Sequence, residues 1–286
     1  MRIFLLPLTT RQALVYCQRV AKPVEQRTII DKVQIKATET WAKWEKAEKG
    51  WQKQVVTYGN RALQRIPYQE WALKSFPSSS ADLQAKQITD EKRFDVVYPG
   101  NFMKEADVSK VLARLARERK QLHFNRFIGS LVAIPFTIPF ALIPVIPNLP
   151  FFYVAYRAWS HWRALKGSDH LDFLIDHRLL QPITTKAIEG LYNKFCPHPI
   201  LDFEFVTRAQ VEAGEVQKEE ILLSAGSHNE AAKVLDVPEL AGEVERAVWQ
   251  VEQNLNEEEK ELKRQQEAVK VTAQKSDPDK DNEKRG

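Results

Sequence analysis

The hydrophobic positions of this chain are concentrated in one stretch, residues 127–156, in which no residue is charged. About 18 uncharged apolar residues already make a transmembrane candidate, and about 20 cross a bilayer as a helix. The stretch is therefore predicted to enter a membrane. Its prolines and its few polar residues are the candidate membrane-embedded positions: Ser130, Pro135, Thr137, Pro139, Pro144, Pro147, Asn148 and Pro150.

Two apolar legs are predicted, from about Phe127 to Ile143 and from about Phe151 to Lys166. The residue before a proline is pushed out of the α region, so the segment PVIPNLP between the legs is predicted to turn, with Asn148 at its tip. At about 1.5 Å per residue the first leg spans roughly 25 Å, slightly less than a hydrocarbon core. Three interpretations remain open: a re-entrant or tight hairpin, a single irregular span, and a hairpin buried in a protein outside the membrane.

Basic and aromatic residues flank the apolar stretch on both sides. Lysine and arginine prefer one face of a membrane, and tryptophan favours the headgroup level, so two basic flanks favour a hairpin that enters and returns. A solvated helix face is the alternative for the same residues. The candidates for lipid-headgroup contact are Arg114, Arg117, Arg119, Lys120, Arg126, Arg157, Trp159, Trp162, Arg163 and Lys166.

The N-terminal third is predicted to be dominated by a long helix from Glu25 to about Tyr58. Its apolar residues recur every seven positions, which is typical of a coiled coil and implies a partner helix in this chain or in another copy. That stripe is Ile30, Ala37, Trp44 and Trp51. Two compatible interpretations apply to MRIFLLPL before it. One is a strand or extended entry, with Thr9 or Thr10 capping a helix through Val20, and the other is an acid-poor import sequence.

Further helices are predicted on both sides of the apolar stretch. Asp107 is a plausible cap for a basic helix that runs directly into the first leg. After Gly167, Ser168 is predicted to cap another helix, whose acids Asp169, Asp172 and Asp176 share one face with His170 and His177 nearby. These groups predict either a metal or proton-relay site or a solvated acidic helix start.

The C-terminal part is predicted to be helical and acidic. Ser227 and Glu230 form a capping box, and an amphipathic helix is expected from Glu239 to about Val269. Past Lys270 the charged, low-complexity composition predicts disorder.

The fold class predicted from these elements is mostly α: a helical membrane protein with one proline-rich membrane-embedded hairpin or single irregular span, and long amphipathic helices on either side. The predicted regions are an N-terminal helical part, a basic and membrane-embedded part, an acidic helical part and a disordered tail, at residues 1–100, 101–180, 181–270 and 271–286.

Charge and motif content narrow the function. The net charge is +4, but residues 211–270 hold 15 acids and 7 bases. The part of the chain before residue 211 is therefore strongly basic. This basic half contains the apolar stretch, and it suits an anionic membrane. No nucleic-acid signature accompanies the basic half, so nucleic acid is not expected as a partner. Cys17 and Cys196 make no disulfide framework. No tested catalytic motif occurs, so neither enzyme activity nor a cofactor nor a bound metal is predicted.

Three strings carry a resemblance to a known family: MRIFLLPLTTRQALVYCQR, KWEKAEKGWQKQVVTYGNRALQRIPYQEWALKSFP and IPNLPFFYVAYRAWSHWRALKGSDHL. They resemble the mitochondrial K⁺/H⁺ exchange-related family of fungal type, over roughly residues 1–240. The resemblance implies a mitochondrial inner-membrane protein needed for electroneutral exchange of potassium for protons, and it carries no site residue. Because the matching string begins at Met1, it favours a retained N-terminus.

Ion carriers line their pathway with polar or ionisable groups at membrane depth, and the apolar stretch holds no carboxylate to couple proton movement. The expected role is therefore a subunit, scaffold or regulator of exchange. The expected partners are a mitochondrial membrane with anionic lipid, and a second copy or another inner-membrane protein bound through the tryptophan-bearing helix. A membrane-bound assembly factor or lipid-binding scaffold without a part in ion transport is the alternative.

Overall fold

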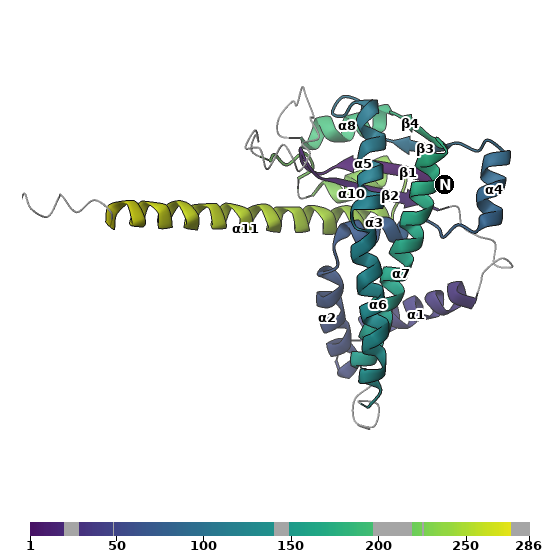
Figure 1. Ribbon diagram of the computed structural model, residues 1–286, viewed down its shortest axis with the longest axis horizontal. Helices are drawn as coiled ribbons and strands as arrows, with labels where there is room; N and C mark the ends of the chain where they lie inside the picture. Colours follow the sequence, from purple (N-terminus) through teal and green to yellow (C-terminus); the bar gives the residue numbers. More distant parts are fainter. Residues whose placement is uncertain (20–28, 48, 140–148, 197–218, 225, 276–286) are drawn as a thin grey trace, which may run out of the picture.

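The centre of the molecule is a four-stranded sheet, which the sequence pattern did not predict. A computed structural model describes residues 1–19, 29–47, 49–139, 149–196, 219–224 and 226–275 (Figure 1). The strand order is β2-β1-β3-β4; β1 and β2 are antiparallel, and the other two pairs are parallel. The strands are β1 (Arg2–Pro7), β2 (Ala13–Gln18), β3 (Phe94–Val97) and β4 (Leu180–Ile183).

The first two strands form a hairpin around Thr9. The Thr9 hydroxyl oxygen accepts hydrogen bonds from the backbone N–H groups of Gln12, at 2.9 Å, and of Arg11, at 3.2 Å. The prediction of a strand at residues 2–7 is confirmed, whereas the predicted helix through Val20 is wrong for residues 13–18. A threonine that bonds nearby N–H groups suits a helix cap and a turn equally, so the local signal did not distinguish them.

The predicted long helix is a helical hairpin instead. Helix α1 (Ile29–Glu45) and helix α2 (Trp51–Gln64) are separated around Gly50, whose φ of 104° is one that L side chains rarely adopt. Trp44 and Trp51 meet edge to face across the break, with ring centroids 5.2 Å apart. The heptad stripe is therefore divided between two helices that pack on each other, and the coiled-coil prediction for this segment is not supported.

The apolar legs belong to two longer helices that lie side by side (Figure 1). The basic helix α5 (Glu105–Glu118) ends at Arg119, and α6 (Lys120–Thr137) begins there. Helix α7 (Leu149–Asp176) continues through the predicted break at Gly167. Gly167 lies against helix α3 (Tyr68–Ser75), and a Cβ there would stand 1.9 Å from the Leu73 carbonyl oxygen. Gly167 is thus a close helix–helix contact, and the predicted helix end is wrong.

The predicted fold class is wrong in two respects. The chain combines its helices with a mixed sheet. In addition, among the residues that the structure describes, no helix has both the length and the apolar character needed to cross a membrane. The apolar legs are continuous with charged segments. These are Lys120–Arg126 on α6, where only His123 is buried, and Arg157–Asp176 on α7, where Ala164 and Leu171 belong to the core.

The described candidate membrane-embedded residues lie on α6, just after it, or at the start of α7. Ser130 and Thr137 donate their hydroxyl hydrogens to backbone carbonyls of α6, at 2.8 Å and 2.6 Å. Pro135 lies inside α6, and Pro150 lies in the first turn of α7. Pro139 directly follows α6 in a short 3₁₀ segment. Pro144, Pro147 and Asn148 lie outside the described residues.

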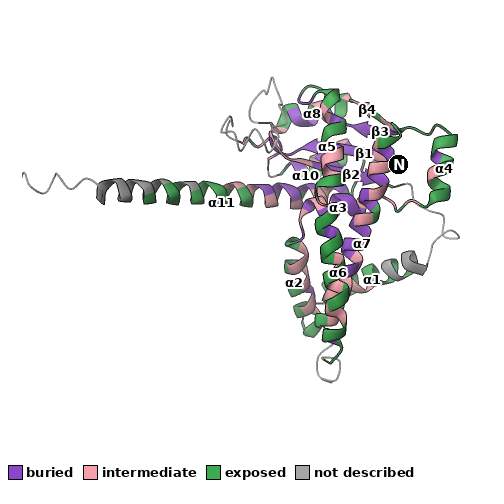
Figure 2. Cartoon of the chain, in the orientation of Figure 1, coloured by how far each residue is buried: buried purple, intermediate pink, exposed green. Residues whose placement is uncertain are grey.

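The C-terminal elements close the core. They are α8 (Lys186–Phe195), α10 (Ser227–Val234) and α11 (Leu240–Lys275), while α4 (Ala81–Thr89) lies at the periphery (Figure 2). The cap of α10 is Gly226, so the predicted Ser227 cap is one residue off. One buried cluster joins β1, β2 and β3 to α3, α5, α7, α8, α10 and the first turns of α11. Within it, Tyr192 of α8 donates its hydroxyl hydrogen to the Pro7 carbonyl oxygen at 2.8 Å.

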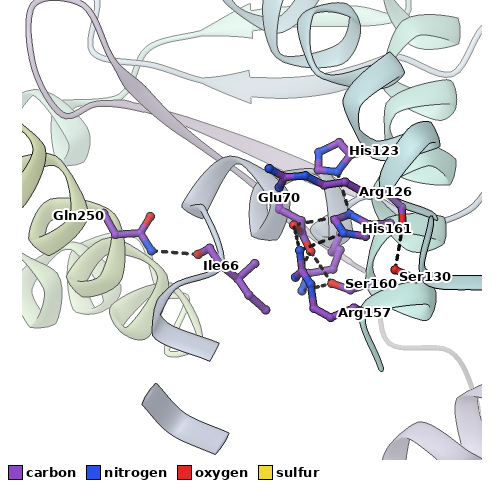
Figure 3. A network of polar contacts seen from close by, with 10 residues as sticks. Ile66, Glu70, His123, Arg126, Ser130, Arg157, Ser160, His161 and Gln250 are labelled. Carbon is purple, nitrogen blue, oxygen red and sulfur yellow. Dashed lines mark hydrogen bonds and ion pairs between the residues drawn. The ribbon is translucent and has the colours of Figure 1, made fainter. Parts of the chain in front are cut away.

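Helix α11 also anchors the turn between α2 and α3. The Gln250 side-chain amide donates to the Ile66 carbonyl oxygen at 2.9 Å (Figure 3). It also donates to the Gln64 carbonyl oxygen at 2.8 Å, and its own oxygen accepts the Tyr68 N–H at 2.9 Å. This contact positions the start of α3, whose inner face carries the polar cluster described next.

Candidate functional site

Six polar side chains from three helices meet inside the molecule where α3 crosses the α6–α7 pair (Figure 3). Helix α3 contributes two of them and α6 one, while α7 contributes three within one turn. Spacings of three and four residues put side chains on one helix face, so each helix directs its members inward. We call this set the buried charge network: Glu70, Lys74, His123, Arg157, Ser160 and His161.

Glu70 is the centre of the network. Its side chain is fully buried, and Arg157, only 14% exposed, holds both carboxylate oxygens at 2.9 Å and 3.2 Å. Ser160 donates its hydroxyl hydrogen to the same carboxylate at 2.6 Å. Burial by itself opposes ionisation, but the Ser160 hydrogen bond and the Arg157 charge outweigh it and lower the pKa of Glu70. Glu70 is therefore a carboxylate in the folded protein.

Lys74 extends the network toward α11. Its ammonium donates to the Ser160 hydroxyl oxygen at 3.0 Å and lies 3.3 Å from the centre of the Trp71 ring. Arg246 of α11 lies 4.4 Å from the centre of the same ring. Burial lowers the pKa of Lys74 to about 7, although the Glu70 charge opposes the shift. Lys74 is thus the member of the network that exchanges a proton near neutral pH.

The two histidines are held in defined tautomers by their neighbours. Arg157 can only donate, so the His161 Nε2 atom 3.0 Å away accepts, and the proton of neutral His161 lies on Nδ1. That N–H points at His123 Nδ1, 3.1 Å distant, which must accept. The proton of His123 therefore lies on Nε2, a buried atom without a hydrogen-bond partner among the described residues. Burial lowers the pKa of each histidine to about 4, with repulsion from Arg157 contributing.

Glu70, His123 and His161 offer ligand atoms within 4.8 Å of one another, which is close enough to share a metal ion. Their existing partners oppose this use. Arg157 already holds both carboxylate oxygens of Glu70. If His161 bound a metal through Nδ1, its proton would move to Nε2, and this N–H would face the Arg157 guanidinium at 3.0 Å, with a donor on each side. A divalent ion would also lie beside the Arg157 guanidinium. The residues present fit protons better than a metal.

In this arrangement no nitrogen of the histidine pair can take an additional proton without losing a contact. At His161 Nε2 it would face the Arg157 guanidinium, and between the two Nδ1 atoms it would place two N–H groups 3.1 Å apart. Either contact must open when the pair is protonated. Glu70 lies 3.8 Å from His161 Nδ1, so a charged His161 has a carboxylate available on α3. Protonation therefore favours a change of partner between α6 and α3.

Several predicted lipid-contacting residues have partners inside the protein. Arg157 belongs to the network, and buried Arg163 donates to the Phe76 carbonyl oxygen at 3.2 Å. Arg114 pairs with Glu118, at 3.0 Å. Trp159, Trp162 and Arg119 are half-buried, while Arg126 and Lys166 are exposed. Their contact with lipid remains a prediction.

The acidic face of α7 pairs with the preceding basic helices. Arg117 contacts Asp172 at 2.6 Å and Asp176 at 2.7 Å, and Lys120 contacts Asp169 at 2.8 Å. These ion pairs join α7 to α5 and α6, so the acids do not form a relay with the nearby histidines. His170 and His177 bond the carbonyl oxygens of Pro77 and Phe173 instead.

Of the six network residues, only Arg157 was named from the sequence; the residues missed were Glu70, Lys74, His123, Ser160 and His161. A weak signal existed, because Glu70 and Lys74, and likewise Arg157 and His161, lie one turn apart next to apolar residues. Glu70 and Arg157 are 87 residues apart, and no sequence spacing indicates that the two pairs meet. Only the packing of α3 on α7 brings them together.

One protein family matches most of the chain. A family model described as mitochondrial K⁺–H⁺ exchange-related matches residues 2–175. An uncharacterized protein of Schizosaccharomyces pombe is 34% identical over 200 residues, which cover 68% of this chain and 84% of that protein. An uncharacterized protein of Saccharomyces cerevisiae is 25% identical over 201 residues, covering 61% and 62% of the two chains. No solved structure matches. The family match contains all six residues of the buried charge network.

Proposed function

Because the chain belongs to the mitochondrial K⁺–H⁺ exchange-related family, we propose that it supports electroneutral potassium–proton exchange at the mitochondrial inner membrane as a regulatory subunit rather than as the sole exchanger. The observation that carries the proposal is the buried charge network, which joins α3 to the α6–α7 pair through groups that bind protons.

The network supplies regulation through its protonation state. Lys74 and Glu70 are joined through Ser160, and Glu70 is joined through Arg157 to the histidine pair, so a proton change at one end alters contacts along the chain of partners. The charged groups around it also act on its titration. They are Arg119 and Arg126 beside the histidines, and Glu243 and Arg246 of α11 beside Lys74. A regulator of proton-coupled exchange needs such a dependence on pH.

The experiment uses mitochondria from a strain that lacks the gene, complemented with the full chain or its variants. Electroneutral exchange is measured as swelling in potassium acetate at a series of matrix pH values. We expect Lys74→Met, which is uncharged at every pH, and Lys74→Arg, which is charged at every pH, to flatten the pH profile of swelling in opposite directions. Lys86→Met, an exposed lysine on α4, is the matched control.

Three results would overturn this proposal. Normal swelling in the deleted strain would remove the chain from exchange. Robust exchange by the purified protein in potassium-loaded liposomes, followed with an internal pH dye, would make it an exchanger by itself. An unchanged pH profile in both Lys74 variants, with normal protein levels, would remove the network from regulation.

A surface contact with the anionic membrane completes the proposal. Large apolar side chains remain exposed where α6 ends and α7 begins, and no charged residue lies among them. They are Ile128, Leu131, Val132, Phe136, Ile138, Phe152 and Tyr153. We expect this end of the pair to rest in the interfacial layer, where aromatic residues are favoured.

Flotation with vesicles that contain anionic lipid tests this contact. We expect Phe136→Ser with Phe152→Ser to reduce the floated fraction several-fold. Tyr58→Ser, an equally exposed aromatic position on α2, should float like the wild type. Equal flotation of the three proteins would show that the exposed end of α6 and α7 is not the membrane contact.

The alternative is an assembly factor or scaffold without a role in ion transport. The polar network also favours this role in one respect, because buried ion pairs can fix a unique packing. Normal swelling after deletion, combined with loss of a membrane complex, would select it.

A further inference from the structure

The outer half of α11 leaves the body of the molecule as a lone helix (Figures 1 and 2). The inner half is part of the core, where Val244, Val248 and Val251 are buried. Beyond Leu255, in contrast, each side chain that the structure describes between Asn256 and Glu267 is exposed. An isolated helix of this length is marginal in water, because nucleation is costly and packing normally supplies the stability.

The sequence continues the apolar spacing of the inner half into the outer half. Val248 and Leu255 are seven residues apart, and Leu262 and Val269 follow at the same interval. Residues seven apart share one face of a helix, and such a stripe is the seam of a coiled coil. The body covers the inner part of this seam, and the described side chains around its continuation, from Asn256 to Glu261 and from Lys263 to Gln265, are exposed. The stripe therefore indicates a second helix alongside the outer half.

The charges of the outer half identify that second helix. Residues 252–262 hold five acids and one base, whereas residues 263–275 hold four bases and one acid. A parallel pair of identical helices would place acids beside acids and bases beside bases. An antiparallel pair centred near Leu262 would place the acidic half of each copy beside the basic half of the other. Opposite charges across a helix seam set partner choice and orientation.

We propose that residues 252–275 bind the same segment of a second copy of this chain in antiparallel orientation. The Leu255 level of one copy then lies opposite Val269 of its partner, and the two Leu262 positions meet at the centre. An internal ion pair, Lys263 with Glu259 at 2.8 Å, supports each helix before association. This interface is separate from the tryptophan-bearing helical hairpin, which packs on itself.

The first test is the molar mass of the full chain by light scattering over a concentration series. We expect twice the monomer mass of 33.0 kDa for the wild type, and the monomer mass for Leu262→Asp with Val269→Asp. Gln253→Asp with Asn256→Asp adds the same charge to the same segment off the stripe and should remain dimeric. A monomeric wild type, or a dimer that persists in the stripe variant, would refute the proposal.

Folding of the variants is checked by the thermal transition of the body, since Leu255 is packed against the core whereas the described side chains from Asn256 to Glu267 are exposed. We expect the truncated chain 1–256 to be monomeric and to unfold at the temperature of the wild-type body.

The orientation is tested with single cysteines on the stripe. In an antiparallel pair, equivalent positions 255 lie about 21 Å apart at about 1.5 Å per residue, too far for a disulfide. We expect Leu255→Cys and Val269→Cys each to resist oxidation to a dimer alone and to cross-link when mixed. The wild type controls for Cys17 and Cys196. Self-cross-linking of each variant would instead show a parallel pair and overturn the assigned orientation.

Discussion

Glu70 compensates the positive charge of Arg157 inside the buried charge network. Removing one partner of a buried ion pair costs about 3–5 kcal/mol, since the other charge is left without compensation. Arg157 keeps a small exposed fraction, so we expect about 3 kcal/mol for Glu70→Gln, measured by urea unfolding. Glu230→Gln makes the same chemical change in an exposed pair with Lys194 and should cost below about 1 kcal/mol. Equal losses would contradict the central role of Glu70.

The histidine pair makes the stability of the fold sensitive to acid. Its folded pKa values are lowered to about 4 from 6.5, so between these pH values the unfolded chain binds protons that the folded protein does not. The free energy of unfolding must therefore fall as pH falls, by up to about 1.4 kcal/mol per pH unit for each histidine. The lowered pKa of Glu70 acts in the same direction at still lower pH.

His161→Gln is expected to reduce this acid dependence, because it removes one of the two titrating groups. The measurement is the urea midpoint between pH 4 and pH 6.5. His177→Gln, at an exposed position directly after α7, is the control and should leave the slope unchanged. An unchanged slope in His161→Gln would show that the pair does not determine acid stability.

Lys74 acts in the same direction as the histidines but at higher pH. Its pKa is lowered from 10.5 to about 7, so between these values the folded protein has released a proton that the unfolded chain retains. Stability must rise with pH across this range. In Lys74→Met the rise should be lost, whereas Lys86→Met should retain it, as measured by denaturant unfolding from pH 7 to pH 10. A rise that survives in Lys74→Met would assign it to another group.

At the scale of elements, the crossing of α3 over α7 depends on Gly167. A Cβ at this position would overlap the Leu73 carbonyl oxygen, which is backbone and cannot turn away. We expect Gly167→Ala to separate the helices and cost at least about 1–3 kcal/mol. Gly190→Ala on α8 and Gly129→Ala on α6 meet no atom within 4 Å and should stabilise by about 0.5–1 kcal/mol, because alanine restricts the unfolded chain.

Thermal unfolding followed by circular dichroism measures these three variants together. The crossing also carries the network, so Gly167→Ala should shift the pH profile of unfolding as well as its midpoint. A Gly167→Ala protein as stable as the two controls would show that α3 and α7 are less closely packed.

At the scale of the whole molecule, one core cluster connects the N-terminal sheet, the central helices and the start of α11. Because these parts share buried side chains, we expect a single cooperative transition with coincident tryptophan fluorescence and circular dichroism curves. A chain that ends at Val237, before α11, should lose this transition. Two separated transitions would show that the parts fold independently.

The sequence by itself determined the features that depend on local spacing. The strand at residues 2–7, the two apolar legs and the amphipathic character of α11 follow from the order of apolar and polar residues. The family resemblance was likewise carried by continuous strings, and the family match confirms it. The basic character of α5 was also visible, although its pairing with the acids of α7 was not.

The tertiary structure decided what long-range packing controls. Gly167 was predicted to end a helix and Gly50 to lie inside one, yet Gly167 is a close helix contact inside α7 and Gly50 lies between two helices that fold back on each other. The sheet pairs β1 with β3 and β3 with β4, strands more than 80 residues apart in the sequence, and no local pattern encodes such a pairing. The buried charge network has the same origin: Glu70 and Arg157 are ordinary surface residue types, and only the approach of α3 to α7 removes them from water and makes each the other's required partner.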